Sequence, residues 1–437
     1  MTKQMVTPWP KVPLGKLAKK LVNGGTPPTG VERFWNGKTP WITGADFTSS
    51  GVGEFRRFVS DEAISQTATN VIENGQLLIV TRTGVGKLAI APCNVAISQD
   101  ITGFYVDEDQ ATPAFLYHRL RRGVEDLKKL NQGTSINGIV RGDLVKYFID
   151  LPPLPEQRRI AKILSTVDKA IEQTEALVGK YQQIRAGLMH DLFTRGVTPD
   201  GRLRPTRAQA PHLYKDSPLG RIPKEWEVKR LGIILKECGG YLQTGPFGSQ
   251  LHAHEYEQEG VPVVMPQDIN EGVISIDQIA RIDERKAEEL SRHRMRVGDI
   301  VIARRGELSR AAAIGESHED WLCGTGCFLL RLGRKALHSD FAAYVYRHDL
   351  IQRQIAGVAV GTTMPSLNNT VMERLFFPLC DPEEQVQITE RLDNLDWLLR
   401  FIQNRVAKLH QQKQGLMHDL LTGRVRVKVG EPEKGVV

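Results

Sequence analysis

The 437-residue chain is too long for one hydrophobic core and indicates two to four domains. Its 58 Lys and Arg residues outnumber its 51 Asp and Glu residues, and the net charge of +7 favours a polyanionic partner. Five cysteines over this length do not make a disulfide framework, and no stretch approaches the roughly 20 apolar residues of a membrane span, so we expect a cytoplasmic protein without a membrane partner.

The first 150 residues contain short aliphatic runs separated by turn residues. Leu77–Val80 and Leu88–Ala91 are examples, and each is bounded by Gly, Asn, Asp or Pro. Such runs favour strands joined by loops. A helical pattern lies between them and the next segment, at Pro113–Leu130. We therefore predict an α+β domain over residues 1–150.

A long amphipathic segment follows at 151–197, and it returns at 377–425 with an offset of 228 residues. In both copies apolar residues recur in alternating steps of four and three, which is the spacing of a coiled-coil seam. We predict two long helices that pack antiparallel along this seam. The predicted seam residues are Ile160, Leu164, Val167, Ile171 and Leu188 in the first helix and Ile388, Leu392, Leu395, Leu399 and Leu416 in the second.

Residues 198–225, between the first helix and the next domain, are rich in proline. Proline at this density blocks helix formation and predicts an extended linker. Residues 426–437, after the second helix, are expected to form a C-terminal tail.

Residues 226–376 match the first domain sparsely but in the same order. Trp226 corresponds to Trp9, and Val297–Ala303 corresponds to Asn74–Val80. We therefore predict a second, similar α+β domain. The order domain, helix, domain, helix predicts an internal repeat with pseudo-twofold symmetry.

Two Gly-rich basic loops directly follow predicted strands, at 81–87 and 304–310. Glycine lets the backbone approach a surface closely, and arginine binds a phosphate or the O6/N7 edge of guanine with two hydrogen bonds. Because the loops occupy equivalent places in both domains, DNA binding is favoured over a solvated hairpin tip. The predicted DNA-binding residues are Arg82, Thr83, Gly84, Lys87, Arg304, Arg305 and Arg310.

The sequence argues against chemistry within this chain. Residues 84–88 resemble part of a phosphate-binding loop, but Leu88 stands where Ser or Thr would hold magnesium. Cys323 and Cys327, with His252 and His254, could bind zinc, yet their spacing is not that of a usual finger. No Gly-rich turn suits S-adenosylmethionine. We expect no catalytic residue and no bound metal or cofactor.

Several motifs follow one another in a specific order along the whole chain. They are Gly24–Pro27, Pro40–Thr43, Leu151–Gln157, Gly187–Leu192 with its repeat at 415–420, Tyr214–Gly220 and Gly245–Ser249. With them the chain resembles the specificity subunit of type I restriction-modification enzymes. The motif before the second helix, at 378–385, departs from the first copy because it lacks the double proline.

The resemblance implies two target-recognition domains, each binding one half of a bipartite sequence in double-stranded DNA, held apart by the helix pair. It also implies assembly with two methyltransferase subunits and with motor-nuclease subunits. S-adenosylmethionine, ATP and Mg would then be bound by these partners, and this chain would be non-catalytic. Two alternatives stay open: a subunit of a related system with a fused methyltransferase-nuclease, and a stand-alone DNA-binding regulator.

Overall fold

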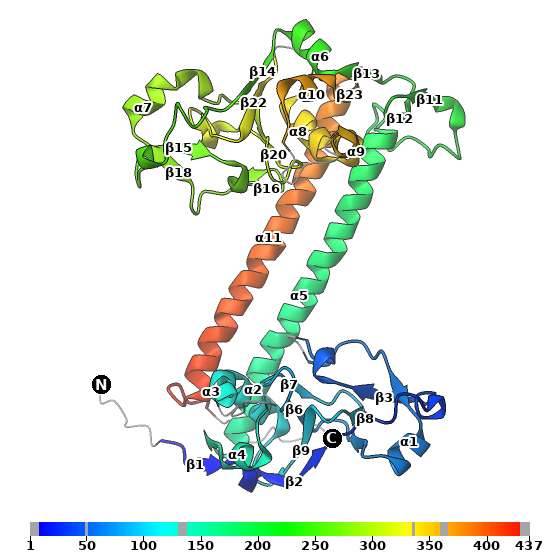
Figure 1. Cartoon of the computed structure of the whole chain (residues 1–437), viewed down its shortest axis with the longest axis vertical. Helices are drawn as coiled ribbons and strands as arrows, with labels where there is room; N and C mark the ends of the chain where they lie inside the picture. Colours follow the sequence, from blue (N-terminus) through cyan, green and yellow to red (C-terminus); the bar gives the residue numbers. More distant parts are fainter. Residues whose placement is uncertain (1–7, 49–50, 130–137, 334–336, 359–365, 429–437) are drawn as a thin grey trace. The chain divides into compact units, whose positions relative to one another are not determined.

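The computed structural model describes residues 8–48, 51–129, 138–333, 337–358 and 366–428 (Figure 1). The chain divides into two compact units, of which unit 1 comprises residues 1–178 and 401–437 and unit 2 comprises residues 179–400. Two long helices, α5 (Leu154–Arg195) and α11 (Pro382–Leu421), each contribute a part to both units. Each unit therefore combines a globular domain with two helix segments.

The globular part of unit 1 holds two four-stranded sheets and the strand pair β1-β10. Its strands are β1 (Lys11–Pro13), β2 (Ala18–Asn23), β3 (Thr39–Ile42), β4 (Phe58–Val59), β5 (Asn70–Ile72), β6 (Leu77–Val80), β7 (Leu88–Ile90), β8 (Val95–Ile97), β9 (Ile101–Val106) and β10 (Phe148–Asp150). Its shorter helices are α1 (Asp61–Gln66), α2 (Pro113–Arg122), α3 (Val124–Lys129) and α4 (Arg141–Lys146). One four-stranded sheet is antiparallel with strand order β2-β9-β6-β7, and the other four-stranded sheet has the order β4-β3-β8-β5 with β3 and β8 parallel.

Unit 2 repeats this plan. Its strands are β11 (Tyr214–Ser217), β12 (Gly220–Pro223), β13 (Glu227–Arg230), β14 (Tyr241–Thr244), β15 (Val261–Val264), β16 (Ile269–Asn270), β17 (Val273–Ile274), β18 (Ala280–Ile282), β19 (Asp299–Ala303), β20 (Ala311–Ala313), β21 (Leu322–Cys323), β22 (Cys327–Arg331) and β23 (Phe376–Leu379). Its shorter helices are α6 (Leu231–Cys238), α7 (Glu284–Glu289), α8 (Ser339–Arg347), α9 (Asp349–Val358) and α10 (Asn369–Arg374).

The strand orders of unit 2 show that the two domains share a topology. The antiparallel sheet β14-β22-β19-β20 corresponds to β2-β9-β6-β7, and β18-β15-β21, with β15 and β21 parallel, corresponds to β4-β3-β8. The strand pairs β1-β10 and β13-β23 also correspond. The predicted mixed α and β repeat is thus confirmed. In the part of the chain that the structure describes, every helix is too short or too polar to cross a membrane.

In both units the first turns of a long helix are buried in the core of a globular domain. Ile160 and Leu164 of α5 share a buried cluster with Phe115 of α2 in unit 1. Ile388 and Leu392 of α11 share one with Phe341 in unit 2. The stripe predicted from periodicity therefore packs on the domain cores as well as between helices, which explains why burial is greatest near the helix starts.

Within each unit the two helix segments run antiparallel. In unit 1, Asp168 of α5 forms an ion pair with Lys413 of α11, and Glu175 Oε1 lies 3.0 Å from His410 Nε2. Residue numbers therefore fall along α11 as they rise along α5. In unit 2, Arg185 of α5 pairs with Asp396 of α11. All predicted seam residues are at least partly covered. Ile160, Leu164, Ile171, Ile388, Leu392 and Leu399 are buried, and Val167, Leu188, Leu395 and Leu416 are half-buried.

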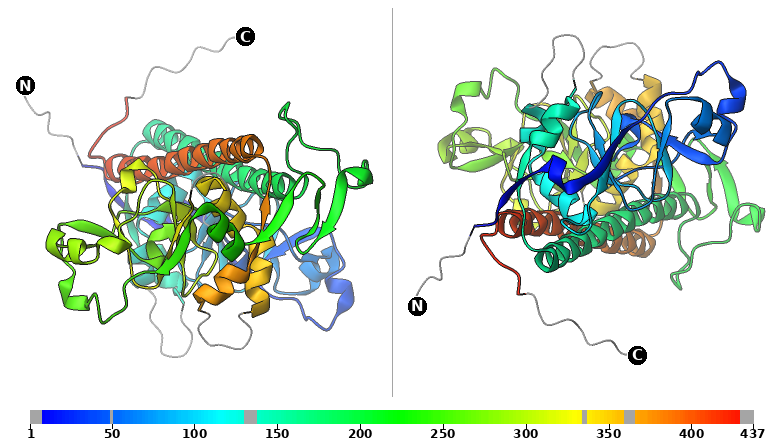
Figure 2. Two further views of the ribbon diagram at one scale, coloured as in Figure 1. Left: turned by 90° about the horizontal axis from the view of Figure 1, so that it is seen from above. Right: turned by 90° about the horizontal axis from the view of Figure 1, so that it is seen from below.

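Some predicted boundaries differ from the structure. Residues 377–379 were expected in the second helix, but they belong to β23, which pairs with β13 before Pro382 begins α11. The segment 198–225 was expected to be an extended linker, yet it forms the β11–β12 hairpin, which projects from unit 2 (Figure 2). The expected tail begins at Arg426, which is instead held by both carboxylate oxygens of Glu156 at 2.7 Å.

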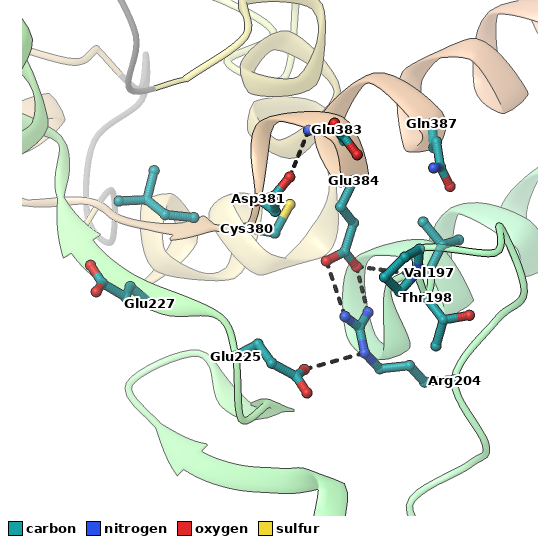
Figure 3. Close-up of a pocket in the computed structure, with 12 residues that line it drawn as sticks. Val197, Thr198, Arg204, Glu225, Glu227, Cys380, Asp381, Glu383, Glu384 and Gln387 are labelled. Carbon is teal, nitrogen blue, oxygen red and sulfur yellow. Dashed lines mark hydrogen bonds and ion pairs between the residues drawn. The ribbon is translucent and has the colours of Figure 1, made fainter.

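The turn after α5 is fixed by a buried carboxylate at the start of α11 (Figure 3). Glu384 accepts hydrogen bonds from the backbone N–H of Val197 at 2.7 Å and from Trp226 Nε1 at 3.1 Å. It also forms a two-point ion pair with Arg204, whose side chain is 8% exposed. This network borders a cavity of about 600 Å³. In unit 1 the equivalent Glu156 binds Arg426, which lies over the ring of Trp9.

Candidate nucleic-acid interface

The predicted DNA-binding loops lie at one end of the antiparallel sheet in each unit. Loop 81–87 joins β6 to β7, and loop 304–310 joins β19 to β20. In unit 1, β9 is antiparallel to both β2 and β6, so the segments after β2 and β6 lie at the same end of the sheet as the segment before β9. In unit 2, β22 is antiparallel to β14 and β19 in the same way. We call this the loop end of each unit. It comprises residues 24–27, 81–87 and 98–100 in unit 1 and residues 245–249, 304–310 and 324–326 in unit 2.

Glycine allows the backbone segments at each loop end to lie in contact. A Cβ atom on Gly24 would lie 2.0 Å from the carbonyl oxygen of Ile97, and one on Gly245 would lie 2.0 Å from that of Gly324. No side chain fits at such distances, so glycine is required at both positions. The Gly-containing motifs found in the sequence thus act by bringing the loop-end segments together.

The two basic loops are closed by equivalent hydrogen bonds. The N–H of Val80 donates to the carbonyl of Lys87 at 2.9 Å, and the N–H of Ala303 donates to that of Arg310 at 2.9 Å. A second bond ties each loop to a later segment of the chain, from Ile139 to the carbonyl of Thr81 at 2.7 Å in unit 1. In unit 2, Leu367 makes this bond to the carbonyl of Arg304 at 3.0 Å. Residues 80–87 and 303–310 are therefore equivalent one for one.

The last residue of each loop is anchored to a turn beside the second sheet, at 44–46 after β3 in unit 1 and at 266–268 after β15 in unit 2. Lys87 Nζ donates to the carbonyl of Gly44 at 2.8 Å. One guanidinium nitrogen of Arg310 donates to the carbonyls of Gln267 at 3.2 Å and Ile269 at 3.1 Å. These contacts give Lys87 and Arg310 a positioning role in the loops, and their contact with DNA stays a prediction.

The remaining predicted residues separate into exposed and half-buried groups. Arg82, Thr83 and Gly84 are exposed at the tip of the first loop, and Arg305 is exposed at the position equivalent to Arg82. Arg304 is half-buried, and its Nε donates to the carbonyl of Leu367 at 2.9 Å. Arg82 and Arg305 are thus exposed cations at equivalent positions of the two loops, which fits them for contact with DNA. Lys87 is also exposed, but its Nζ is bonded to the carbonyl of Gly44.

The 3-10 turns that receive the loop anchors differ in charge. Asp46 caps the turn at 44–46 and also binds Arg56, whose Nε lies 2.9 Å from its Oδ1. Burial tends to raise the pKa of Asp46, but hydrogen bonds from Arg56 and Thr43 lower it below its usual range. The equivalent Asp268 caps the turn at 266–268, and its burial raises its pKa. Unit 1 therefore carries additional positive charge beside its loop.

Sequence reasoning missed several residues at the loop ends or in the turns that anchor them. Arg56 and Arg57 were visible as a basic pair, but their contacts with Asp46 depend on the fold. Phe247 is 53% exposed, although the segment that carries it is fixed by the bond from Thr325 Oγ1 to the carbonyl of Pro246 at 2.9 Å. The Gly245–Ser249 motif was a signal for this segment, but the sequence alone gave no reason to place Phe247 near loop 304–310.

The cysteine and histidine residues considered for zinc are separated by the fold. Cys323 and Cys327 are buried, and the Sγ of Cys327 lies 3.5 Å from the carbonyl oxygen of Val264. Burial raises the pKa of the Cys327 thiol well above its usual value. His252 and His254 are exposed, and their imidazole rings stack with ring centres 5.5 Å apart. Over the described residues, no group of three or more His, Cys, Asp or Glu side chains could hold a metal ion.

A family model described as the type I restriction modification DNA specificity domain matches residues 7–178 and 223–411, which cover most of both repeats. The chain belongs to this family. It is a type I specificity subunit with two such domains, and this arrangement is consistent with recognition of a bipartite DNA target. The resemblance predicted from the ordered motifs is confirmed.

The similarity to other specificity subunits covers most of this chain. The MjaVIII specificity subunit of Methanocaldococcus jannaschii is 24% identical over 427 residues, covering 96% of this chain and 93% of its own. The EcoBI specificity subunit of Escherichia coli is 22% identical over 343 residues, covering 75% and 69%. The crystal structure of a type I S subunit from M. genitalium has the same fold, with a TM-score of 0.63, 18% identity and coverage of 96% and 97%.

Proposed function

We propose that each unit binds one half of a bipartite DNA sequence through its loop end, with Arg82 in unit 1 and Arg305 in unit 2 contacting the DNA. The observation that carries this proposal is the pair of loops with equivalent closing bonds but different side chains. Equivalent geometry would present each loop to its half-site in the same way. Different side chains would allow the two half-sites to differ in sequence.

We further propose that α5 and α11 form one antiparallel coiled coil related by a pseudo-twofold axis. Asp168 and Asp396 occupy equivalent places in the 228-residue repeat, as do Arg185 and Lys413. The ion pair of unit 1 therefore has an equivalent partner pair in unit 2. A single twofold relation accounts for both, and such a helix pair would hold the recognition domains apart.

As a specificity subunit the chain would act with restriction-modification partners on DNA, and we propose that it does so in the cytoplasm. We propose two methyltransferase subunits, one for each repeat, together with motor-nuclease subunits. S-adenosylmethionine, ATP and Mg would be bound by those partners. This chain would then contribute recognition and assembly, without a catalytic residue of its own.

The test is methylation-site mapping of complexes assembled with Arg82→Ala or Arg305→Ala. Loss of a bidentate base contact costs roughly 1–3 kcal/mol and relaxes preference at the contacted position. Each variant should relax one half-site and leave the other unchanged. Arg202→Ala, which removes an exposed arginine outside both loops, is the matched control. Unchanged preference in both half-sites of both loop variants would reject the assignment.

A further inference from the structure

Phe247 is an exposed aromatic residue on a backbone segment that is held in place. Its side chain is 53% exposed. Just before it, the N–H of Gly245 donates to the carbonyl of Cys327 at 2.9 Å, and Thr325 Oγ1 donates to the carbonyl of Pro246 at 2.9 Å. These two bonds tie the segment to the start of the long strand β22.

The turn after Phe247 is fixed as well. The N–H of Phe247 donates to Gln250 Oε1 at 3.1 Å, and its carbonyl accepts from the N–H groups of Gln250 at 2.8 Å and Leu251 at 3.2 Å. Leu251 is buried in a small apolar cluster. The ring of Phe247 therefore projects into solvent from a rigid support.

Single exposed apolar residues are common on protein surfaces, so exposure alone assigns no role to Phe247. Its position does. The N–H of Arg304 donates to the carbonyl of Gly326 at 2.8 Å, so the segment 324–327 is bonded both to loop 304–310 and to the segment that carries Phe247. Phe247 and Arg305 are thus presented at one loop end.

The equivalent position in unit 1 carries a polar residue. The N–H of Gly24 donates to the carbonyl of Ile101, the first residue of β9, as the N–H of Gly245 does to the first residue of β22. Counting from these glycines places Thr26 where unit 2 has Phe247. Thr26 is exposed, and its hydroxyl bonds the side chain of Gln99. The two loop ends therefore differ in polarity at this position.

An aromatic ring can read only some features of a base pair. Phenylalanine has no hydrogen-bonding group, whereas most of the pattern in the major groove consists of donors and acceptors. The apolar exception is the C5-methyl group of thymine. The O6/N7 edge of guanine, which suits Arg305, lies in the same groove. A ring at the same loop end is therefore suited to a thymine methyl group.

We propose that Phe247 is a specificity-determining residue of unit 2, and that its ring packs on the C5-methyl group of a thymine in the half-site that unit 2 binds. This inference rests on the proposed function, in which the loop end of unit 2 contacts that half-site. It adds that the half-site contains a thymine whose methyl group contributes to binding.

The first test removes the methyl group from the DNA. The complex of the chain with its methyltransferase subunits is titrated with target duplexes in gel shifts at one salt concentration. Each thymine of the unit 2 half-site, in either strand, is replaced in turn by deoxyuridine, which lacks only this methyl group. At one position the affinity should fall about three- to fourfold, the effect of burying one methyl group. A half-site without such a thymine would overturn the proposal.

The second test removes the ring from the protein. Phe247→Ser should lower the affinity for the thymine duplex about five- to tenfold, and it should bind the thymine and deoxyuridine duplexes equally. Phe247→Leu, which keeps an apolar side chain, should retain part of the difference between the duplexes. An undiminished difference in Phe247→Ser would overturn the assignment. Because the side chain is exposed, the thermal stability of the chain should stay unchanged in both variants.

Val297→Ser is the matched control. Val297 is 50% exposed in the same unit, but it precedes β19, whereas loop 304–310 follows that strand. The control should bind both duplexes as the wild type does. A loss equal to that of Phe247→Ser would show that any exposed apolar residue of unit 2 affects binding, and it would overturn the proposal. Deoxyuridine in the unit 1 half-site should act equally on wild type and Phe247→Ser.

Arg305→Ala separates this inference from the proposed function, since it identifies the half-site of unit 2. If Arg305→Ala relaxes that half-site and deoxyuridine has no effect there, the thymine contact alone is rejected. The same holds if Phe247→Ser weakens binding without any deoxyuridine effect, which would indicate another contact of the ring, such as insertion between base pairs. Unchanged recognition in both Arg82→Ala and Arg305→Ala would instead reject the proposed function, and this inference with it.

Discussion

The two units differ most in the loops that end their sheets and least in the helices that leave their domains. Loops 81–87 and 304–310 share only the arginine at their second position, although they are closed by the same hydrogen bonds. The hexapeptides 187–192 and 415–420 are identical. The comparison separates two roles: surfaces that differ are suited to two different DNA half-sites, and surfaces that agree are suited to two copies of one partner.

The largest difference in stability should appear at the helix starts. Glu384→Gln removes the charge that compensates Arg204, which is buried, and breaking one side of such a pair costs about 3–5 kcal/mol. Glu156→Gln should cost less, on the order of 1 kcal/mol, because Arg426 is 35% exposed and can be solvated. Chemical denaturation of the two variants measures both values, and equal losses would contradict the distinction.

The seam provides the next comparison. Ile171 and Leu399 occupy equivalent positions in the two repeats, and each is 6% exposed. Replacing either with alanine should lower the unfolding free energy by about 2–5 kcal/mol, since the lost side chain leaves a cavity. Leu177→Ala, at a position that is 40% exposed on α5, is the control and should cost much less. Equal effects of the control and the seam variants would argue against helix pairing.

One position shared by α2 and α8, held by His118 in unit 1 and by Tyr344 in unit 2, should respond to acid in unit 1 alone. Burial lowers the pKa of His118 to about 4, whereas Tyr344 stands at its equivalent position in unit 2. The unfolded chain binds a proton at His118 near pH 6.5 and the folded chain does not, so unit 1 loses stability as pH falls from 6.5 to about 4. The loss reaches roughly 3 kcal/mol at pH 4.

His118→Tyr, which copies unit 2, should remove this part of the pH dependence. In unit 2 the Tyr344 hydroxyl oxygen lies 2.7 Å from Asp393 Oδ1 and 2.9 Å from Asp396 Oδ2, so its one proton has two carboxylate acceptors. The equivalent residues in unit 1 are Ser165 and Asp168. The new hydroxyl therefore has acceptors within the same network. Denaturation curves between pH 4 and 7 measure the effect, and an unchanged slope would show that His118 is not responsible.

Much of the fold follows from local patterns in the sequence. The long helices were predictable because apolar residues keep their period over many turns, and the loops were located because Leu77–Val80 and Ile300–Ala303 are short aliphatic runs followed by glycine. Strand β23 was missed because Phe376–Leu379 contains a proline and directly precedes a helix, so only its pairing with β13 identifies it. The local sequence of this segment therefore does not indicate a strand, although the segment pairs as one.

The candidate site was predictable in position but not in the roles of its residues. Lys87 and Arg310 looked like Arg82 and Arg305, since all four are cations in Gly-containing loops. Their difference arises from backbone carbonyls about 40 residues away in the chain, at Gly44 and near Gln267. Long-range contacts of this kind carry no local signal, which is why sequence alone could not separate the anchored cations Lys87 and Arg310 from Arg82 and Arg305.

The most direct test of two-unit recognition is a loop exchange. Residues 304–310 are replaced by the sequence of 81–87, which has the same length and the same closing hydrogen bonds. The exchanged chain is assembled with its partners, and methylated adenines are mapped by long-read sequencing. Recognition should change in the half-site bound by unit 2 and stay unchanged in the other. An active complex with both half-sites unaltered would contradict recognition through the loop ends.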